Sequence, residues 1–146
     1  MALAIATVAD SISKLSVTGL TIEDVDNLSV FIASPPVLAP MPDYITNFEI
    51  EYDSFGSGDT AQKTIRYDLN YRLYYAQVGS ARKLAPFEGL VDMIAAILDA
   101  VIDVVNITGA IEIMPAGTIR PGIVLAPDGA QFFGCDFAFR VTEFDN

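Results

Sequence analysis

The sequence lacks the residue types on which enzyme and metal chemistry most often depends. Its 146 residues include no His, no Trp and a single Cys, Cys135. Ser-His-Asp and Cys-His catalysis both need a His, and zinc sites built from Cys and His need several such ligands. A lone Cys also leaves no partner for an internal disulfide. These absences exclude most familiar catalytic chemistry, and we expect no cofactor and no bound metal.

Positively charged residues are also scarce. Eight Lys and Arg against nineteen Asp and Glu give a net charge of −11, and Arg82-Lys83 is the longest basic run. Without a longer run, binding to nucleic acid phosphates is disfavoured. Charged residues form 18% of the chain and apolar residues 52%, which favours a subunit whose exposed faces are covered by neighbours. A compact acidic monomer is the alternative.

No apolar run is suited to crossing a membrane or to directing secretion. The first nine residues contain no Lys or Arg, whereas a secretory signal begins with basic residues. Residues 84–105 are interrupted by four acidic side chains, which makes a membrane span unfavourable. Together with the single Cys, these features predict folding in the cytoplasm. The length predicts one domain over residues 1–146.

Hydrophobic periodicity predicts two helices and a set of strands. Apolar residues recur at helical spacing over residues 2–15 and 84–105, and they alternate most clearly over residues 46–53, 64–75 and 133–141. Four shorter strands are expected at residues 20–22, 29–32, 110–114 and 123–125. The order predicts an α+β fold: a mostly antiparallel β-sheet with a long hairpin, packed by an N-terminal helix and a central amphipathic helix.

Prolines and glycines mark two segments that we expect to lie on the surface. Four prolines within residues 34–42 remove backbone donors and fix φ, which predicts an extended arm or loop. A glycine-rich loop is expected at residues 55–61. Either segment is a simple connector or a docking segment that reaches a neighbour. The expected docking residues are Pro35, Pro36, Pro40, Pro42, Phe55, Gly56, Ser57, Gly58 and Asp59.

The alternating strands divide their side chains between a buried and an exposed face. The residues expected to point inward are Phe48, Ile50, Tyr52, Ile65, Tyr67, Leu69, Tyr71, Leu73, Tyr75, Phe133, Cys135, Phe137, Phe139 and Val141. The tyrosines among them could line a ligand pocket, but this spacing is more typical of a core. Cys135 is expected to be packed and unreactive for the same reason.

Acidic side chains gather in two places. Glu49, Glu51 and Asp53 share one strand face, and Glu88, Asp92, Asp99 and Asp103 form a stripe on the central helix. Paired carboxylates can perform acid-base chemistry or bind a divalent cation. Each set lies opposite an apolar face, however, so the favoured interpretation is the solvated side of an amphipathic element.

Charges of both signs lie on the outer face of the strand at residues 64–75. Arg66, Asp68 and Arg72 alternate with the inward residues, in a chain that is otherwise nearly all negative. Mixed charges along a strand suit a neighbour with the complementary pattern. Our hypothesis is that these three residues form a subunit interface.

The order and lengths of these elements resemble the tail terminator proteins of long-tailed bacteriophages and related neck or head-tail joining proteins. The resemblance covers an N-terminal helix, the proline-bearing segment at residues 37–42, the strand at residues 66–75 and the turn at residues 78–82. It continues through the helix at residues 87–105 and the final strand at residues 133–143. It consists of a pattern of elements and contains no diagnostic motif.

The resemblance implies a virion protein of the tail or neck that is assembled in the host cytoplasm. Such a subunit closes into a homohexameric ring on the head-proximal end of the tail tube, ends tube polymerisation and binds the tube protein and a neck or head completion protein. Such a subunit catalyses no reaction, which agrees with the absent His. DNA passes through without specific binding, and no membrane is involved. Six copies would carry a formal charge of −66, six times −11, and like-charged walls keep phosphates from adhering.

The two acidic sets described above are the candidate linings of that channel. Other functions remain open from the sequence: another neck or tail tube structural protein, or a small α+β ligand-binding protein or pocket enzyme.

Overall fold

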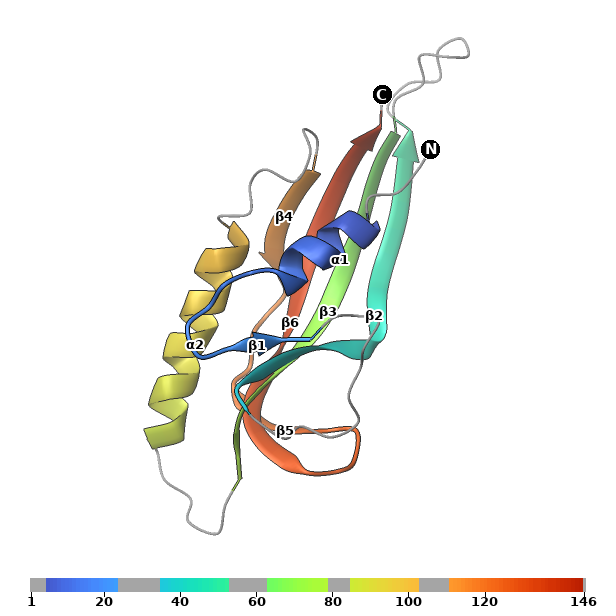
Figure 1. The fold of residues 1–146 in the computed structure, drawn as a ribbon. Coiled ribbons are helices and arrows are strands. Elements are labelled where there is room, and N and C mark those ends of the chain that lie inside the picture. The colour runs from blue at the N-terminus through green and yellow to red at the C-terminus, as the bar shows by residue number, and fades with distance from the viewer. Residues whose placement is uncertain (1–4, 24–34, 53–62, 79–84, 103–110, 146) are drawn as a thin grey trace.

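The computed structural model describes residues 5–23, 35–52, 63–78, 85–102 and 111–145 (Figure 1). Its elements are α1 (Ile5–Ser13), β1 (Thr21–Ile22), β2 (Val37–Tyr52), β3 (Lys63–Gln77), α2 (Ala85–Ile102), β4 (Ile111–Ala116), β5 (Gly122–Leu125) and β6 (Gln131–Asp145). Both helices and β3 lie where the periodicity predicts them, whereas β2 begins at Val37 and not at residue 46. The strand expected at residues 29–32 lies outside the described residues.

The strands form one sheet in the order β1-β2-β3-β6-β4, and β5 also pairs with β6. β1 is parallel to β2, and the other pairings are antiparallel. β4 pairs with β6 between Ala138 and Glu143, and β5 pairs with β6 between Gln131 and Gly134, so these two short strands share one edge of β6. The α+β fold with a mostly antiparallel sheet is therefore confirmed.

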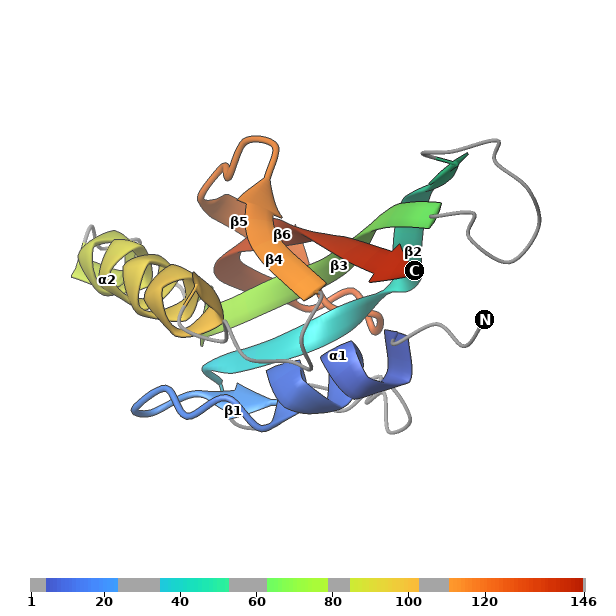
Figure 2. The ribbon, with the colours of Figure 1, turned by 90° about the horizontal axis from the view of Figure 1, so that it is seen from above.

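Both helices lie on the same face of the sheet (Figures 1 and 2). α1 turns Val8 and Ile12 toward the sheet, and both side chains are buried. α2 buries a stripe at helical spacing, namely Leu90, Ile94, Ile97 and Val101. Residues three or four apart share a helix face, which is why one side of each helix joins the core while the other faces solvent.

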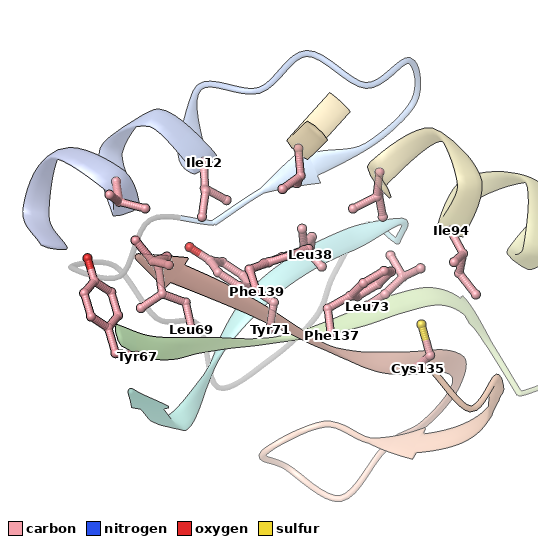
Figure 3. Close-up of a cluster of buried hydrophobic side chains, with 14 of the residues drawn as sticks. Ile12, Leu38, Tyr67, Leu69, Tyr71, Leu73, Ile94, Cys135, Phe137 and Phe139 are labelled. Carbon is pink, nitrogen blue, oxygen red and sulfur yellow. The ribbon is translucent and has the colours of Figure 1, made fainter. Parts of the chain in front are cut away.

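The core lies between the helices and the long strands β3 and β6 (Figure 3). Side chains alternate across a strand, so every second residue of β3 and β6 points toward the helices. Tyr71 packs against Phe139 with ring centroids 5.7 Å apart, and Phe137 stacks on Phe139 at 5.6 Å. Tyr67 and Tyr71 are buried in this core, as the spacing predicts.

Two glycines allow close packing between elements. A Cβ on Gly134 would collide with the backbone carbonyl of Leu73 on β3, and a Cβ on Gly89 of α2 would collide with the hydroxyl of Tyr75. Glycine at these positions lets β6 approach β3 and lets the Tyr75 ring contact the helix.

The proline-rich segment is not a surface arm. Residues 37–42 form the first part of β2, and Val37, Leu38, Ala39 and Pro40 are buried. Proline is tolerated in a strand at an edge or a bulge, where its missing N–H is not needed. β1 pairs with only two residues of β2, and the ladder to β3 is irregular between Pro40 and Ile45, so these conditions hold here.

The far half of β2 is less buried than its alternation predicts. Ile50 pairs with Ile65, and Phe48 stacks on Tyr67, so both lie on the core face. Phe48 is nevertheless 44% exposed and Ile50 49% exposed. The expectation that they are buried is wrong, because alternation sets the direction of a side chain but not whether a helix covers it.

Candidate interaction surfaces

The outer face of the sheet, opposite the helices, carries a ladder of ion pairs. Arg66 binds Glu51 at 2.8 Å between Nη1 and Oε2. Arg72 binds both oxygens of Asp136, with Nε at 2.6 Å from Oδ1 and Nη2 at 3.0 Å from Oδ2. The β-pleat places these side chains on one face, and the antiparallel register brings β2, β3 and β6 partners side by side.

Asp68 forms the most buried pair of this ladder. Its side chain is 6% exposed and accepts a hydrogen bond from Arg140 Nε at 3.0 Å and one from Asn47 Nδ2 at 2.8 Å. Asn47 lies at an irregularity in β2 with φ of 53°, a backbone conformation that Asn tolerates. Burial alone would raise the pKa of Asp68, but the hydrogen bonds from Arg140 and Asn47 outweigh it and hold the pKa below its ordinary value of 3.8.

The expectation that Asp68 and Thr64 point into solvent is therefore wrong. Both lie on the outer face, but Asp68 is 4% exposed and Thr64 3% exposed. Long neighbouring side chains, above all that of Arg140, cover the strand.

Arg66, Asp68 and Arg72 each have a partner inside the chain. Their charges are thus balanced without a neighbouring subunit, which removes the physical reason first given for an interface there. An interface role for these three residues stays a prediction.

The two acidic sets lie on the surface as far as the structure describes them. Glu49 and Glu51 are exposed on β2, and Glu88, Asp92 and Asp99 are exposed on α2. Asp53 and Asp103 lie outside the described residues, as do the expected docking residues Phe55, Gly56, Ser57, Gly58 and Asp59. Of the expected docking prolines, Pro42 is exposed, Pro35 and Pro36 are half-buried, and Pro40 is buried in β2.

Two titratable groups of the core, Tyr67 and Cys135, have pKa values above their ordinary values. Tyr67 donates a hydrogen bond to Oε2 of Glu143 at 2.7 Å, and burial followed by this hydrogen bond raises the pKa of Tyr67. Burial also raises the pKa of the Cys135 thiol to about 12. Cys135 is packed in the core, as predicted, and its raised pKa disfavours the thiolate, which is the nucleophilic form. Within the described ranges no group of three or more Asp, Glu or Cys is arranged to hold a metal ion.

Large apolar side chains are exposed on five elements. The exposed residues are Ile45, Phe48 and Ile50 on β2, Val91 and Ile102 on α2, Met114 on β4, Ile123 and Leu125 on β5, and Phe144 on β6. Val91 and Ile102 belong to the apolar residues that recur at helical spacing over residues 84–105, which predicts that they join the buried face of the helix. Both instead lie outside the buried stripe of Leu90, Ile94, Ile97 and Val101, so the buried face is narrower than the apolar pattern predicts.

A pocket of about 560 Å³ lies on the outer face, where β6 passes from its pairing with β5 to its pairing with β4. We call it the Arg120 pocket; its lining residues are Arg72, Thr118, Arg120, Ile123, Val124, Leu125 and Asp136. A second, more apolar hollow of about 400 Å³ adjoins it and shares Arg72 and Leu125. Sequence reasoning missed the Arg120 pocket because its residues come from β3, β5, β6 and the segment before β5.

No protein-family model matches this chain, and no curated protein is detectably similar to it in sequence. In the part of the chain that the structure describes, neither helix has the length and apolar character needed to span a bilayer. Any functional proposal therefore depends on the surfaces described above and on the pattern of elements in the sequence.

Proposed function

We propose that this chain is a structural virion protein that closes into a ring, most simply of six copies, at the head-proximal end of a phage tail tube. It ends tube polymerisation there, joins the tail to the neck or head, and leaves a passage for DNA. The proposal starts from the resemblance of the element pattern to tail terminator and neck proteins.

The observation that supports it best is the separation of exposed apolar side chains onto different sides of the molecule. Val91 and Ile102 lie on α2, whereas Ile123 and Leu125 lie on β5, and each is at least 50% exposed. Contiguous exposed apolar surface marks contact sites in proteins, and we take these two pairs of side chains as the centres of two contact surfaces. Two different patches suit a head-to-tail contact between identical copies, and such contacts generate rings when the rotation closes.

The charge of the chain agrees with a DNA passage. The exposed carboxylates of β2 and of α2 supply two acidic surfaces, and the chain carries a net charge of −11. A negative wall repels the phosphate backbone and so prevents DNA from adhering during transit. Either surface is a candidate lining of the channel.

Assembly of tail tubes tests the proposal. Tube subunits of the phage that encodes this chain would be polymerised with and without the purified chain, and tube lengths would be measured by electron microscopy. We expect the chain to stop elongation and to form a single ring at one tube end. Long cylinders made of the chain itself would instead identify a tube subunit, and unchanged tube growth with no ring would contradict both roles.

A further inference from the structure

Arg120 differs from the other described arginines in its lack of an ion pair. The other Arg side chains that the structure describes, Arg66, Arg72 and Arg140, each form an ion pair. Within the described residues, Arg120 is exposed and has no carboxylate at ion-pair distance. In a chain with more than twice as many acidic as basic residues, a guanidinium that lacks an internal partner is available to an external one.

The surroundings of Arg120 favour an acidic group from outside. Arg72 also lines the Arg120 pocket, and the carboxylate of Asp136 balances its charge. Arg72 is fixed in place, because its Nη1 also donates to the backbone oxygen of Leu125 at 3.1 Å. The pocket thus carries a net charge of +1 on a strongly negative molecule, with the hydroxyl of Thr118 beside it and Ile123 and Leu125 at its rim.

The outer side of α2 has the complementary character. At about 100° per residue, the exposed side chains that the structure describes on this helix fall on the side opposite the buried stripe. We call this side the α2 outer stripe; it contains Glu88, Val91, Asp92, Ala95, Ala96, Asp99 and Ile102. It extends for about 21 Å along the helix. The stripe carries both carboxylates and exposed aliphatic side chains. The pocket combines the guanidinium of Arg120 with the aliphatic side chains of Ile123 and Leu125.

We propose that the α2 outer stripe of one copy docks on the Arg120 pocket of the next copy, with a carboxylate of the stripe bound by Arg120. This inference rests on the ring proposed above and names the surfaces that form it. α2 covers the core face of the sheet (Figure 2), whereas the Arg120 pocket lies on the outer face, so a contact between these two surfaces is head-to-tail. Because this contact uses the carboxylates of α2, Glu49 and Glu51 of β2 remain as the carboxylates that line the channel.

Charge reversal and its compensation test the contact. Arg120→Glu is expected to weaken ring assembly by roughly tenfold or more, because like charges then meet across the contact. Each carboxylate of the α2 outer stripe would be reversed singly, as Glu88→Arg, Asp92→Arg or Asp99→Arg. The reversal of the carboxylate that binds Arg120 should weaken ring assembly to a similar extent. Combined with Arg120→Glu in the same chain, that reversal should restore assembly. Ring assembly is read by sedimentation velocity and by electron microscopy of tube ends.

Lys14→Glu is the matched control. It changes the net charge by the same amount, but directly after the end of α1, where Lys14 is paired with Asp10 and exposed. It should leave assembly near that of the parent. Thermal unfolding followed by circular dichroism would establish that every variant is folded.

Disulfide cross-linking gives an independent readout. A chain with Val91→Cys would be mixed with a chain with Ile123→Cys under oxidising conditions, and a covalent dimer between the two chains is expected. The native Cys135 is buried and gives no background.

Three outcomes would overturn the inference. If rings form but Arg120→Glu assembles as the parent does, or no α2 reversal restores it, this contact is wrong while the ring survives. If the parent chain stays monomeric both alone and with tube ends, the ring itself is wrong. If the parent binds a short fluorescent DNA duplex and Arg120→Glu does not, the pocket is a phosphate site.

Discussion

The two faces of the sheet differ in how they are held together, although the same three long strands build both. The helix-covered face holds the larger apolar core, where Phe137, Phe139 and Tyr71 pack as aromatic rings. The outer face is held by ion pairs and, at the end near β5, by a smaller buried cluster of Val37, Ala39, Tyr74, Ala126 and Phe132. Among the charged outer-face residues that the structure describes, Asp68 is buried. Area removed from water stabilises the first face, whereas exposed ion pairs contribute little. The stability of the chain should therefore depend mainly on one face, and the other is left to make contacts.

The largest expected effect comes from removing a core aromatic side chain. Phe139→Ala should lower the free energy of unfolding by about 3–5 kcal/mol, because a buried ring is replaced by a cavity. Urea denaturation followed by circular dichroism measures the change. Phe144→Ala is the matched control on the same strand: Phe144 is 45% exposed, and its loss should cost less than about 1 kcal/mol. Equal losses for the two variants would contradict the comparison.

The next effect concerns the buried hydroxyl on the helix-covered face. Tyr67→Phe removes the hydrogen bond to Glu143 and keeps the ring, so we expect a loss of about 1–3 kcal/mol in the free energy of unfolding. Tyr75→Phe is the control, because within the described residues the Tyr75 hydroxyl forms no hydrogen bond. A loss for Tyr75→Phe as large as that for Tyr67→Phe would show that the hydrogen bond is not the cause.

Asp68, the neighbour of Tyr67 in sequence, tests the opposite face. Asp68→Asn should destabilise the chain by about 1–2 kcal/mol at neutral pH, because it weakens hydrogen bonds to Arg140 and Asn47. The pKa of Asp68 is lower in the folded than in the unfolded chain, so its stabilisation is present above about pH 4 and is lost as the pH falls through the folded pKa.

The parent should accordingly lose more stability on acidification than Asp68→Asn does. Urea midpoints measured from neutral pH down to about pH 3 would show this difference between the two curves. Parallel curves for parent and variant would mean that Asp68 does not contribute through its charge.

The smallest effect is expected at the exposed end of the ladder. Arg66→Ala should change the free energy of unfolding by less than about 1 kcal/mol, because both partners of the Arg66–Glu51 pair are largely exposed. Arg72→Ala should cost more, since its side chain is only 26% exposed and also donates to the Leu125 carbonyl. The reverse order in urea denaturation would contradict the view that burial decides the value of each pair.

Much of the fold could be predicted from the sequence because its strongest signals are periodic. The strands at β3 and β6 alternate over many residues, and α2 repeats apolar residues at helical spacing. Such patterns report the direction of side chains directly. They predicted both the helix-covered core and the buried Cys135.

What the sequence could not predict depends on contacts between distant segments. The burial of Asp68 needs Arg140, 72 residues away, and an irregularity at Asn47. β2 begins among prolines whose sequence predicts a loop, and it is a strand because Val37 and Leu38 pair with β1 on one side and with β3 on the other. No pattern in the sequence indicates a binding role for Arg120, because its pocket forms only when β3, β5 and β6 come together.

The most direct test of the account is the symmetry of the assembled protein. Class averages from electron microscopy of the purified chain, alone and bound to tail tube ends, would show whether copies surround an opening. We predict a single closed ring, with six copies around the passage. A solitary chain under both conditions would contradict the account.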